Sequence, residues 1–223
     1  MKSLLSGESL VRRYGDVTAL GGVSLELARG EILALGGPSG SGKTTLLAML
    51  GGLETPTEGR VMLDGYDLYA LSHAVRARVR GDRVGFVFQT HNLLSTLTAE
   101  ENVMLAVQHG PNPTGDPRAR ARESLALLGV THEAGRLPRA LSLGQQQRVA
   151  IARALAAGPP VIIADEPTAS LDSQSGAAVL DALKLAAQRG CAVLLATHDP
   201  RCLAIASRVV TLRDGRCEAP PAA

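Results

Sequence analysis

The chain has 223 residues, of which 45% are hydrophobic, 20% are charged and only 2% are aromatic, and its formal net charge is +2. These values predict a globular protein with one substantial core built from Ala, Leu, Val and Ile. This net charge is too small to indicate nucleic-acid binding by itself, and nucleic acid is not an expected partner.

Several features predict a cytoplasmic location. No apolar run approaches the roughly 20 residues that a membrane-spanning helix needs. The N-terminus reaches Glu8 and Arg12 before any long apolar segment, unlike a secretory signal. The three cysteines have no metal-ligand spacing and are expected to be reduced. Any association with a membrane is therefore expected to be made through a partner.

Hydrophobic periodicity predicts alternating strands and helices. Apolar and polar residues alternate over 8–35, which is typical of β-strands. The predicted strands then cover 31–35, 60–63, 84–88, 161–164, 191–197 and 209–212, and the predicted helices cover 46–50, 73–80, 99–109, 118–128, 144–157, 173–189 and 200–206. This alternation predicts an α/β fold with a mostly parallel sheet.

One long segment departs from this alternation. Between about 90 and 157 the hydrophobic period is helical, and a proline-rich loop at 110–117 separates two of its helices. We therefore expect residues 1–223 to form a single domain whose α/β core carries an all-helical insertion at about 90–157. The last four residues, 220–223, are predicted to be a short tail.

The strand at 31–35 runs into a glycine-rich loop, Gly37-Pro38-Ser39-Gly40-Ser41-Gly42-Lys43-Thr44, which is followed by Thr45. It fits the phosphate-loop pattern G-x-x-x-x-G-K-[ST], in which backbone N–H groups and a helix N-terminus surround phosphate oxygens. Lys43 is predicted to bridge the β- and γ-phosphates of a nucleotide, and Thr44 to bind Mg²⁺ through its hydroxyl. A Gly/Ser-rich loop that fits by chance is disfavoured, because a strand precedes it and a helix follows.

Two acids, Asp165 and Glu166, end the apolar strand at 161–164. The C-terminal edge of a parallel strand faces the ligand crevice. Asp165 is therefore predicted to hold Mg²⁺, directly or through water, and Glu166 to orient or polarise the attacking water. Without the phosphate loop, an exposed acidic turn before Pro167 would be the better interpretation.

The run Leu141-Ser142-Leu143-Gly144-Gln145-Gln146-Gln147-Arg148 resembles the signature of ATP-binding cassette (ABC) ATPases. Other landmarks of that family follow in order over about 4–218. Tyr14 matches the aromatic residue that stacks on adenine, Gln89 the Q-loop glutamine, Asp172 of Ser170-Leu171-Asp172 the D-loop aspartate, and His198 the switch histidine.

Each landmark also has a simpler interpretation when it is taken singly. Tyr14 would be an edge-strand aromatic, Gln89 a polar strand end and Asp172 an acid stabilised at a helix N-terminus. The remaining histidines lack such a context and are predicted to be surface residues: His73, His91, His109 and His132.

The resemblance implies a P-loop NTPase core with a mostly parallel sheet, an N-terminal antiparallel β subdomain and an inserted all-helical signature subdomain. It also implies hydrolysis of ATP, with ATP and Mg²⁺ as cofactors. The implied catalytic residues are Glu166, His198 and Gln89, and Gln89 also joins Thr44 and Asp165 as an implied metal ligand.

The resemblance further implies a homodimer in the ATP-bound state. Two chains pack head to tail, and Ser142, Gly144 and Gln145 of one chain approach the γ-phosphate bound by the other. ATP binding then favours the closed dimer, and hydrolysis releases it. Leu143 departs from the family, which usually has glycine there. Either this side chain points away from the nucleotide, which is the favoured interpretation, or the closed dimer forms poorly.

Local runs around Gln89, Asp165 and His198 resemble the lipoprotein-releasing and macrolide-export branch of the family. This branch implies an ATPase subunit that is held on the inner face of the cell membrane by a separate permease. The surface from Gln89 to Val103 is expected to receive that permease. The same stretch also predicts an ordinary helix capped by Thr98 and Glu101, and both interpretations can hold together.

Two other functions compete with the transporter subunit. One is a nucleotide-gated regulatory ABC protein of the divisome type, which would act without turnover. Glu166 and His198 argue against it, because they favour hydrolysis. The other is a soluble ABC ATPase of DNA repair or translation, which usually has a second cassette or a long insertion that this sequence lacks. A basic stretch is predicted to be a solvated helix face, with anionic lipid as the alternative contact: Arg76, Arg78, Arg80 and Arg83.

Overall fold

The computed structural model describes residues 3–111 and 113–218, so the predicted tail at 220–223 lies outside the described residues. The strands are β1 (Ser3–Tyr14), β2 (Val17–Ala28), β3 (Ile32–Gly36), β4 (Glu58–Leu63), β5 (Tyr66–Asp67), β6 (Val84–Val87), β7 (Val161–Asp165), β8 (Ala192–Ala196), β9 (Arg208–Arg213) and β10 (Arg216–Cys217). The helices are α1 (Lys43–Leu50), α2 (His73–Arg83), α3 (Ala99–His109), α4 (Pro117–Leu127), α5 (Leu143–Ala156), α6 (Ser173–Gln188) and α7 (Pro200–Ile205), with 3₁₀ turns η1 (Thr131–Glu133) and η2 (Pro138–Ala140). The predicted elements all occur, with bounds shifted by a few residues.

The described strands form two sheets. A four-stranded antiparallel sheet has the order β2-β1-β4-β5, and a six-stranded sheet has the order β10-β9-β3-β8-β7-β6. In the second sheet every pair from β9 to β6 is parallel, and only β10 runs antiparallel to its neighbour. The predicted N-terminal antiparallel sheet and mostly parallel core sheet are therefore confirmed.

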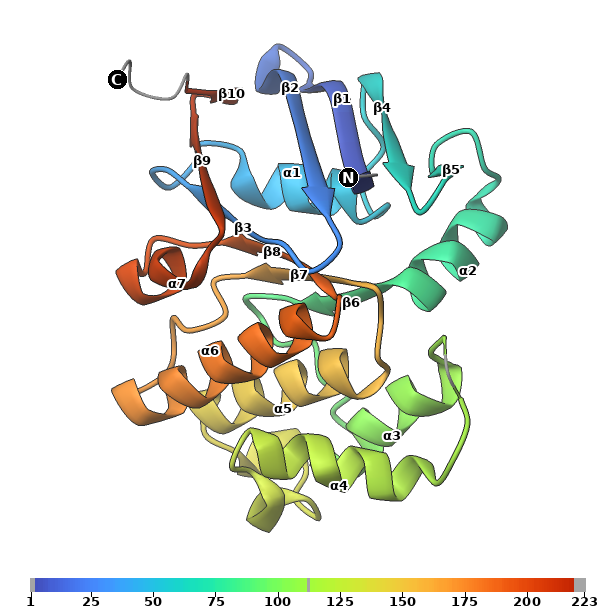
Figure 1. Ribbon diagram of the computed structural model, residues 1–223, viewed down its shortest axis with the longest axis vertical. Coiled ribbons are helices and arrows are strands. Elements are labelled where there is room, and N and C mark those ends of the chain that lie inside the picture. The colour runs from blue at the N-terminus through green and yellow to red at the C-terminus, as the bar shows by residue number, and fades with distance from the viewer. Residues whose placement is uncertain (1–2, 112, 219–223) are drawn as a thin grey trace.

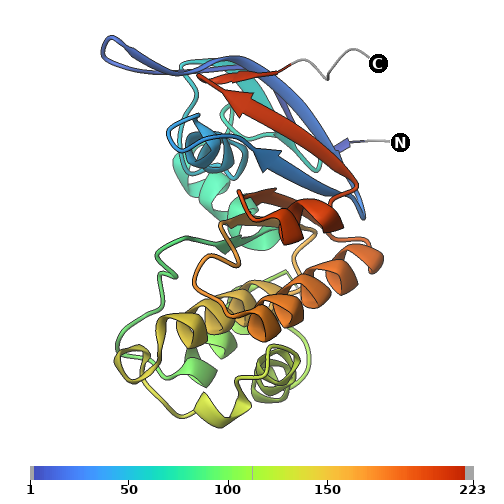
Figure 2. The ribbon, with the colours of Figure 1, turned by 90° about the vertical axis from the view of Figure 1, so that its left-hand side faces the viewer.

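The six-stranded sheet is covered on both faces, as Figures 1 and 2 show. Val161 and Ile163 of β7 pack in one buried cluster with α1 and the N-terminal sheet, whereas Ile162 and Ala164 pack in a second cluster with α3 to α6. Successive residues of a strand point to opposite faces, so burial on both faces explains why this strand reads as an unbroken apolar run.

The helices α3, α4 and α5 pack together beneath the sheet, between β6 and β7 in the chain (Figure 1). Thr98 and Glu101 form the predicted capping box at the start of α3. Glu100 is buried and ties α3 to α4, because its Oε1 accepts hydrogen bonds from Arg118 (2.6 Å) and Arg122 (3.0 Å). In the part of the chain that the structure describes, no helix is both long and apolar enough to cross a membrane.

Candidate functional site

The phosphate loop lies between β3 and α1, and three of its glycines have backbone angles that other residues rarely adopt. Their φ angles are +132° at Gly37, +79° at Gly40 and +100° at Gly42. A Cβ at Gly37 would lie 2.1 Å from the carbonyl oxygen of Leu212, and one at Gly42 would lie 2.7 Å from that of Ala19. Glycine is therefore required both by the backbone conformation and by the close approach of β9 and β2.

The polar groups of the loop fit an anionic ligand. Lys43 Nζ donates hydrogen bonds to the carbonyl oxygens of Gly37 (2.8 Å) and Pro38 (2.9 Å), so the ammonium group lies over the loop. Ser41 is buried, and its Oγ has no partner among the described residues. Because α1 begins at Lys43, the N–H groups of its first turn have no helical acceptor and face the loop with the positive end of the helix dipole. Together these donors fit phosphate oxygens.

Thr44 and Asp165 meet at the edge of the sheet. Thr44 Oγ1 donates a 2.7 Å hydrogen bond to Asp165 Oδ2. Burial raises the pKa of Asp165, and the Thr44 hydrogen bond partly offsets that shift. A hydroxyl and a carboxylate oxygen are ligands that Mg²⁺ accepts alongside phosphate and water. Within 3–111 and 113–218, no group of three His, Cys, Asp or Glu side chains is arranged to hold a metal ion by itself.

Glu166 and His198 also come together, from the ends of neighbouring strands. β7 and β8 are paired so that Asp165 lies opposite Ala196, which places the next residues of both strands at one edge. Glu166 Oε1 lies 2.7 Å from His198 Nδ1, and the Glu166 side chain is mostly buried whereas His198 is exposed. Glu166 has a positive φ of 50°, which is unusual for a residue with a side chain. A carboxylate held in this way is positioned to accept a proton from water.

The signature residues begin α5. Ser142 is the N-cap of this helix, its Oγ accepts a hydrogen bond from the Gln145 N–H (3.2 Å), and Gln145 Oε1 accepts one from the Ser142 N–H (2.9 Å). A capping box was not predicted here, although the Ser-x-x-Gln spacing was a signal for it. Leu143 is the first residue of the helix and is 64% exposed, so its side chain points away from the protein core.

The signature helix contacts the segment that follows Glu166. Gln147 is buried, and its Nε2 donates to the carbonyl oxygen of Pro167 (3.1 Å). A Cβ at Gly144 would lie only 3.0 Å from the carbonyl oxygen of Ser170, so the D-loop packs closely on the start of α5. α5 and α1 pack on opposite faces of the six-stranded sheet (Figure 1). The signature helix and the phosphate loop of one chain are therefore not brought together.

Tyr14 and Asp172 each lie at the boundary of an element. Tyr14 ends β1 and is half exposed, and the Arg12 guanidinium lies 4.5 Å from the centroid of its ring. Arg12 is held in turn by Glu54. Asp172 is the N-cap of α6, where its Oδ1 accepts from the Ser175 N–H (2.9 Å), as expected of an acid at a helix N-terminus.

Gln89 stands in the exposed turn after β6, and the loop beyond it is fixed by residues that sequence reasoning missed. Arg153 of α5 donates to the carbonyl oxygens of His91 (3.0 Å) and Asn92 (2.7 Å). The prediction that His91 is a surface residue is wrong, because it is only 6% exposed and its Nε2 has no partner among the described residues. Burial lowers the pKa of His91 and of Arg153. His91 and Asn92 both have positive φ, a turn that no motif in the sequence indicated.

A hollow of about 520 Å³ lies beside this loop, between β6, α3 and the end of α5. Apolar side chains contribute much of its lining, among them Phe86, Phe88, Leu94 and Leu105. The two phenylalanine rings stack at 5.2 Å. This hollow adjoins the surface at 89–103 that was expected to receive a permease.

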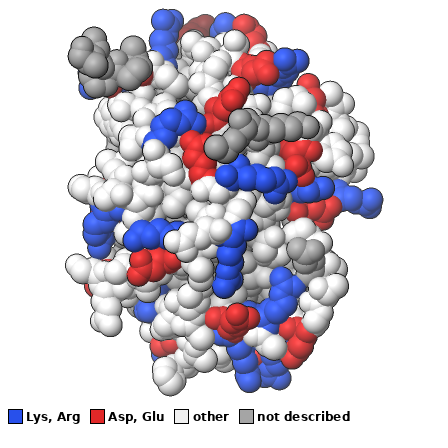
Figure 3. All heavy atoms as spheres, viewed as in Figure 1, with Lys and Arg blue, Asp and Glu red and all other residues white. Residues whose placement is uncertain are grey.

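The basic stretch of α2 is partly engaged within the protein. Arg83 Nη1 contacts Asp64 Oδ2 (2.5 Å), Arg80 donates to the Gly52 carbonyl oxygen (3.1 Å), and the Arg76 guanidinium lies 5.1 Å from the centroid of the Tyr69 ring. Figure 3 shows basic and acidic groups interspersed on the face it displays. Neither feature indicates a continuous basic surface.

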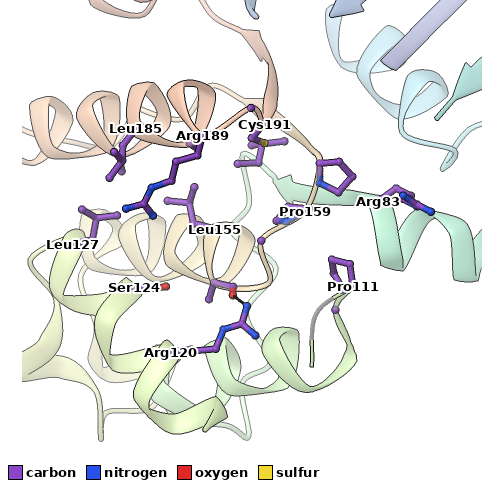
Figure 4. A pocket seen from close by; sticks show the side chains of 18 of the residues that line it. Arg83, Pro111, Arg120, Ser124, Leu127, Leu155, Pro159, Leu185, Arg189 and Cys191 are labelled. Carbon is purple, nitrogen blue, oxygen red and sulfur yellow. Dashed lines mark hydrogen bonds between the residues drawn. The ribbon is translucent and has the colours of Figure 1, made fainter. Parts of the chain in front are cut away.

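A larger hollow of about 980 Å³ lies near the starts of β7 and β8, at the edge of the six-stranded sheet opposite to Asp165 and Glu166 (Figure 4). Its lining combines apolar side chains such as Leu127, Leu155 and Leu185 with Arg189 and Cys191. None of the predicted nucleotide-site residues lines it. It is therefore not the predicted nucleotide site, although it is larger than the hollow beside β6.

Comparison with known proteins shows the family to which the chain belongs. The family described as "ABC transporter" matches residues 20–169, more than half of the chain. The chain belongs to this family, and it is an ABC ATPase with the α/β fold of such cassettes.

Two relatives are 44% identical to the chain. One is the macrolide export ATP-binding/permease protein MacB of Campylobacter jejuni, over 177 residues that cover 79% of this chain and 28% of MacB. The other is an ABC transporter ATP-binding protein of Thermotoga maritima that is described as uncharacterized, over 202 residues that cover 91% of this chain and 86% of that protein. The chain thus spans less than a third of the length of MacB.

Two solved structures of the cassette MJ0796 are similar to the chain at 39% identity. Each match covers 96% of this chain and 97% of the MJ0796 chain. A dimeric structure of MJ0796 has a TM-score of 0.91, and a dimeric post-hydrolysis structure with ADP and Pi has a TM-score of 0.90. These values confirm the predicted fold class.

Proposed function

We propose that the chain is the nucleotide-binding subunit of an ABC transporter, which dimerises around two ATP molecules to drive a separate permease of the export or lipoprotein-release type. The observation that carries this proposal is the meeting of Thr44 with Asp165 and of Glu166 with His198 at one edge of the sheet, after the phosphate loop. The similarity to MacB supports the export branch.

We assign the phosphates to the loop at 37–45, where Lys43 and the free N–H groups of α1 bind β- and γ-oxygens. Thr44 and Asp165 are the residues that would hold Mg²⁺, with Gln89 as a further ligand, and the ion when bound would neutralise charge on the phosphate oxygens. Tyr14 offers its exposed ring to adenine, and Asp172 contributes from the D-loop.

Glu166 acts as the general base for the attacking water. Its mostly buried carboxylate is fixed by His198, and the exposed imidazole of His198 is free on its other side to hydrogen-bond the γ-phosphate. We infer that Gln89, in its exposed turn, responds both to nucleotide and to a partner protein.

The second half of each site comes from a second chain. α1 and α5 lie on opposite faces of one sheet, so the signature of a chain cannot serve the chain's own phosphate loop. In a head-to-tail homodimer, Ser142, Gly144 and Gln145 approach the γ-phosphate of the partner through the N-terminus of α5. The dimeric structures of MJ0796 support a dimer of two such cassettes.

The permease contacts the surface from Gln89 to Val103. The apolar hollow beside β6 and α3 offers a seat for a partner helix, and the loop that borders it is tied by Arg153 to the signature helix. Movement of α5 on ATP binding would therefore reach the permease surface through this contact. The helical segment at about 90–157 is the subdomain that makes that movement, and the chain lies on the cytoplasmic face of the membrane.

The decisive experiment is Glu166→Gln with purified protein. Loss of the base slows hydrolysis by about a hundredfold or more, so ATP persists and gel filtration should show a dimer that the wild type forms only briefly. A monomer that holds ATP would contradict the two-chain site. Wild-type protein without ATPase activity, even with its permease, would contradict an enzymatic function.

A further inference from the structure

Asp199 joins the two segments that carry Glu166 and His198. One segment follows β7 and the other follows β8 and opens α7. Asp199 Oδ2 accepts a 2.7 Å hydrogen bond from Thr168 Oγ1, and Thr168 is only 2% exposed. The buried thiol of Cys202 lies 3.3 Å from the same hydroxyl. The Thr168 side chain is therefore held by the segment that follows β8.

The Asp199 carboxylate is itself firmly fixed. Its Oδ2 accepts from Arg201 Nη2 (2.7 Å) and Nε (3.0 Å), and its Oδ1 accepts from the Arg201 N–H (2.8 Å). These hydrogen bonds hold the pKa of Asp199 well below its usual range. The carboxylate is thus charged and oriented under the conditions in which ATP hydrolysis is measured.

A second path leads from Asp199 to Glu166. The Asp199 N–H donates to Thr197 Oγ1 (2.9 Å), and Thr197 Oγ1 donates to Glu166 Oε2 (3.4 Å). Thr197 is fully buried. Thr168 belongs to the same segment as Glu166. The segment that follows β7 and the segment that follows β8 are therefore linked twice, once through Thr168 and Asp199 and once through Glu166 and Thr197.

We propose that Asp199 is a positioning residue for ATP hydrolysis, which clamps Thr168 to the start of α7 and so keeps the Glu166 carboxylate and the His198 imidazole in one arrangement. This inference rests on the proposed function, in which Glu166 is the general base. A misplaced base slows the chemical step. Nucleotide binding is spared, because Asp199 does not contact the phosphate loop residues, so kcat should change and KM should not.

The chain supplies a matched control for the capping role of Asp199. Asp116-Pro117-Arg118 begins α4 with the same three residues as Asp199-Pro200-Arg201, and Asp116 Oδ1 accepts from the Arg118 N–H (2.9 Å). Asparagine caps a helix about as well as aspartate. Asp199→Asn and Asp116→Asn therefore keep both caps, and only Asp199→Asn removes the acceptor of Thr168.

The test measures kcat and KM for ATP and the thermal midpoint of Asp199→Asn, Thr168→Val, Thr168→Ser, Asp116→Asn and Glu166→Gln in the full chain. Asp199→Asn and Thr168→Val should lower kcat about tenfold, with KM within about twofold of the wild type. Thr168→Ser retains the hydroxyl and should retain kcat. Asp116→Asn should change neither constant.

Unchanged kcat in Thr168→Val and Asp199→Asn, with Glu166→Gln inactive, would overturn this inference and leave the proposed function standing. Equal loss in Thr168→Ser and Thr168→Val would also overturn it, because the hydroxyl would then have no part. Full turnover in Glu166→Gln would overturn the proposed function itself. The two threonine variants decide the question even if Asp199→Asn fails to fold.

Discussion

Thr44 Oγ1 and Asp165 Oδ2 are joined by a 2.7 Å hydrogen bond although their residues lie 121 positions apart in the sequence. Thr44 belongs to the first turn of α1 and Asp165 ends β7, two strands away from β3 in the sheet. The bond defines the point at which the phosphate loop and the acidic strand end converge. Three predictions test the site built around it, and a fourth tests the packing of the helical segment.

The first prediction concerns the site shared between two chains. Lys43→Ala removes the cation over the phosphate loop, and Ser142→Arg places a long side chain at the start of α5. Each should lower turnover by about a hundredfold or more when tested alone. An equal mixture should recover up to about a quarter of wild-type activity, because half of the dimers are mixed and each has one intact site. ATPase assays of the mixture check this, and no recovery would contradict the head-to-tail dimer.

The second prediction concerns Asp165, whose pKa is raised by burial. A raised pKa in the folded state contributes stability below the ordinary pKa of aspartate, and that contribution is lost as pH rises through the folded-state value. At pH 7 the charged carboxylate therefore lowers the free energy of unfolding. Asp165→Asn should raise the thermal midpoint without nucleotide and yet lower turnover by about a hundredfold or more. The exposed Asp181 offers a control, since Asp181→Asn should alter neither.

The third prediction concerns the unusual leucine of the signature. Leu143 is exposed at the first position of α5, so Leu143→Ala should leave turnover within about twofold of the wild type. Gly144→Ala should be far more harmful, because its Cβ would lie 3.0 Å from the Ser170 carbonyl oxygen. ATPase rates, and dimer formation with ATP in a Glu166→Gln background, compare the two. A larger loss in Leu143→Ala than in Gly144→Ala would contradict this placement.

The fourth prediction concerns Glu100, whose hydrogen bonds with Arg118 and Arg122 lower its pKa from the ordinary 4.5. A lowered pKa contributes stability above the unfolded-state value, and that contribution is lost as pH falls through the folded-state value. Glu100→Gln should lower the free energy of unfolding by about 1 kcal/mol at pH 7, since both arginines are largely exposed.

Chemical denaturation of both proteins between neutral and acidic pH checks this prediction. The difference between wild type and Glu100→Gln should shrink as pH falls below the ordinary glutamate pKa. A difference that is constant with pH would assign the effect to packing of the side chain rather than to its charge. ATP binding should be the same in both proteins, because Glu100 lies in α3.

The helices and strands were largely predictable because their signals are local. Four consecutive apolar residues predict the strand at 161–164. Thr98, three positions before Glu101, predicts the start of α3. The two-residue strands β5 and β10 were not predicted. Arg216 and Cys217 pair with Arg213 and Leu212 only because β9 is already part of the sheet.

Burial of polar side chains was less predictable than the elements themselves. His91 was expected at the surface, yet it is buried, and Arg153 of α5, 62 positions away, donates a hydrogen bond to its carbonyl oxygen. Thr168 likewise gives no local sign that it is buried against Asp199. Such contacts depend on elements that are distant in the chain, so no short motif encodes them.

The sequence by itself determined the phosphate loop, the apolar strands, the signature and the family, because each depends on residue types at fixed short spacings. The tertiary structure decided which of these residues meet. Strand order and register place Glu166 beside His198 and Thr44 beside Asp165. Packing on both faces of one sheet separates the signature helix from the phosphate loop of its own chain. Local hydrogen bonding and periodicity fix each element, whereas only the assembled sheet fixes the distances between them.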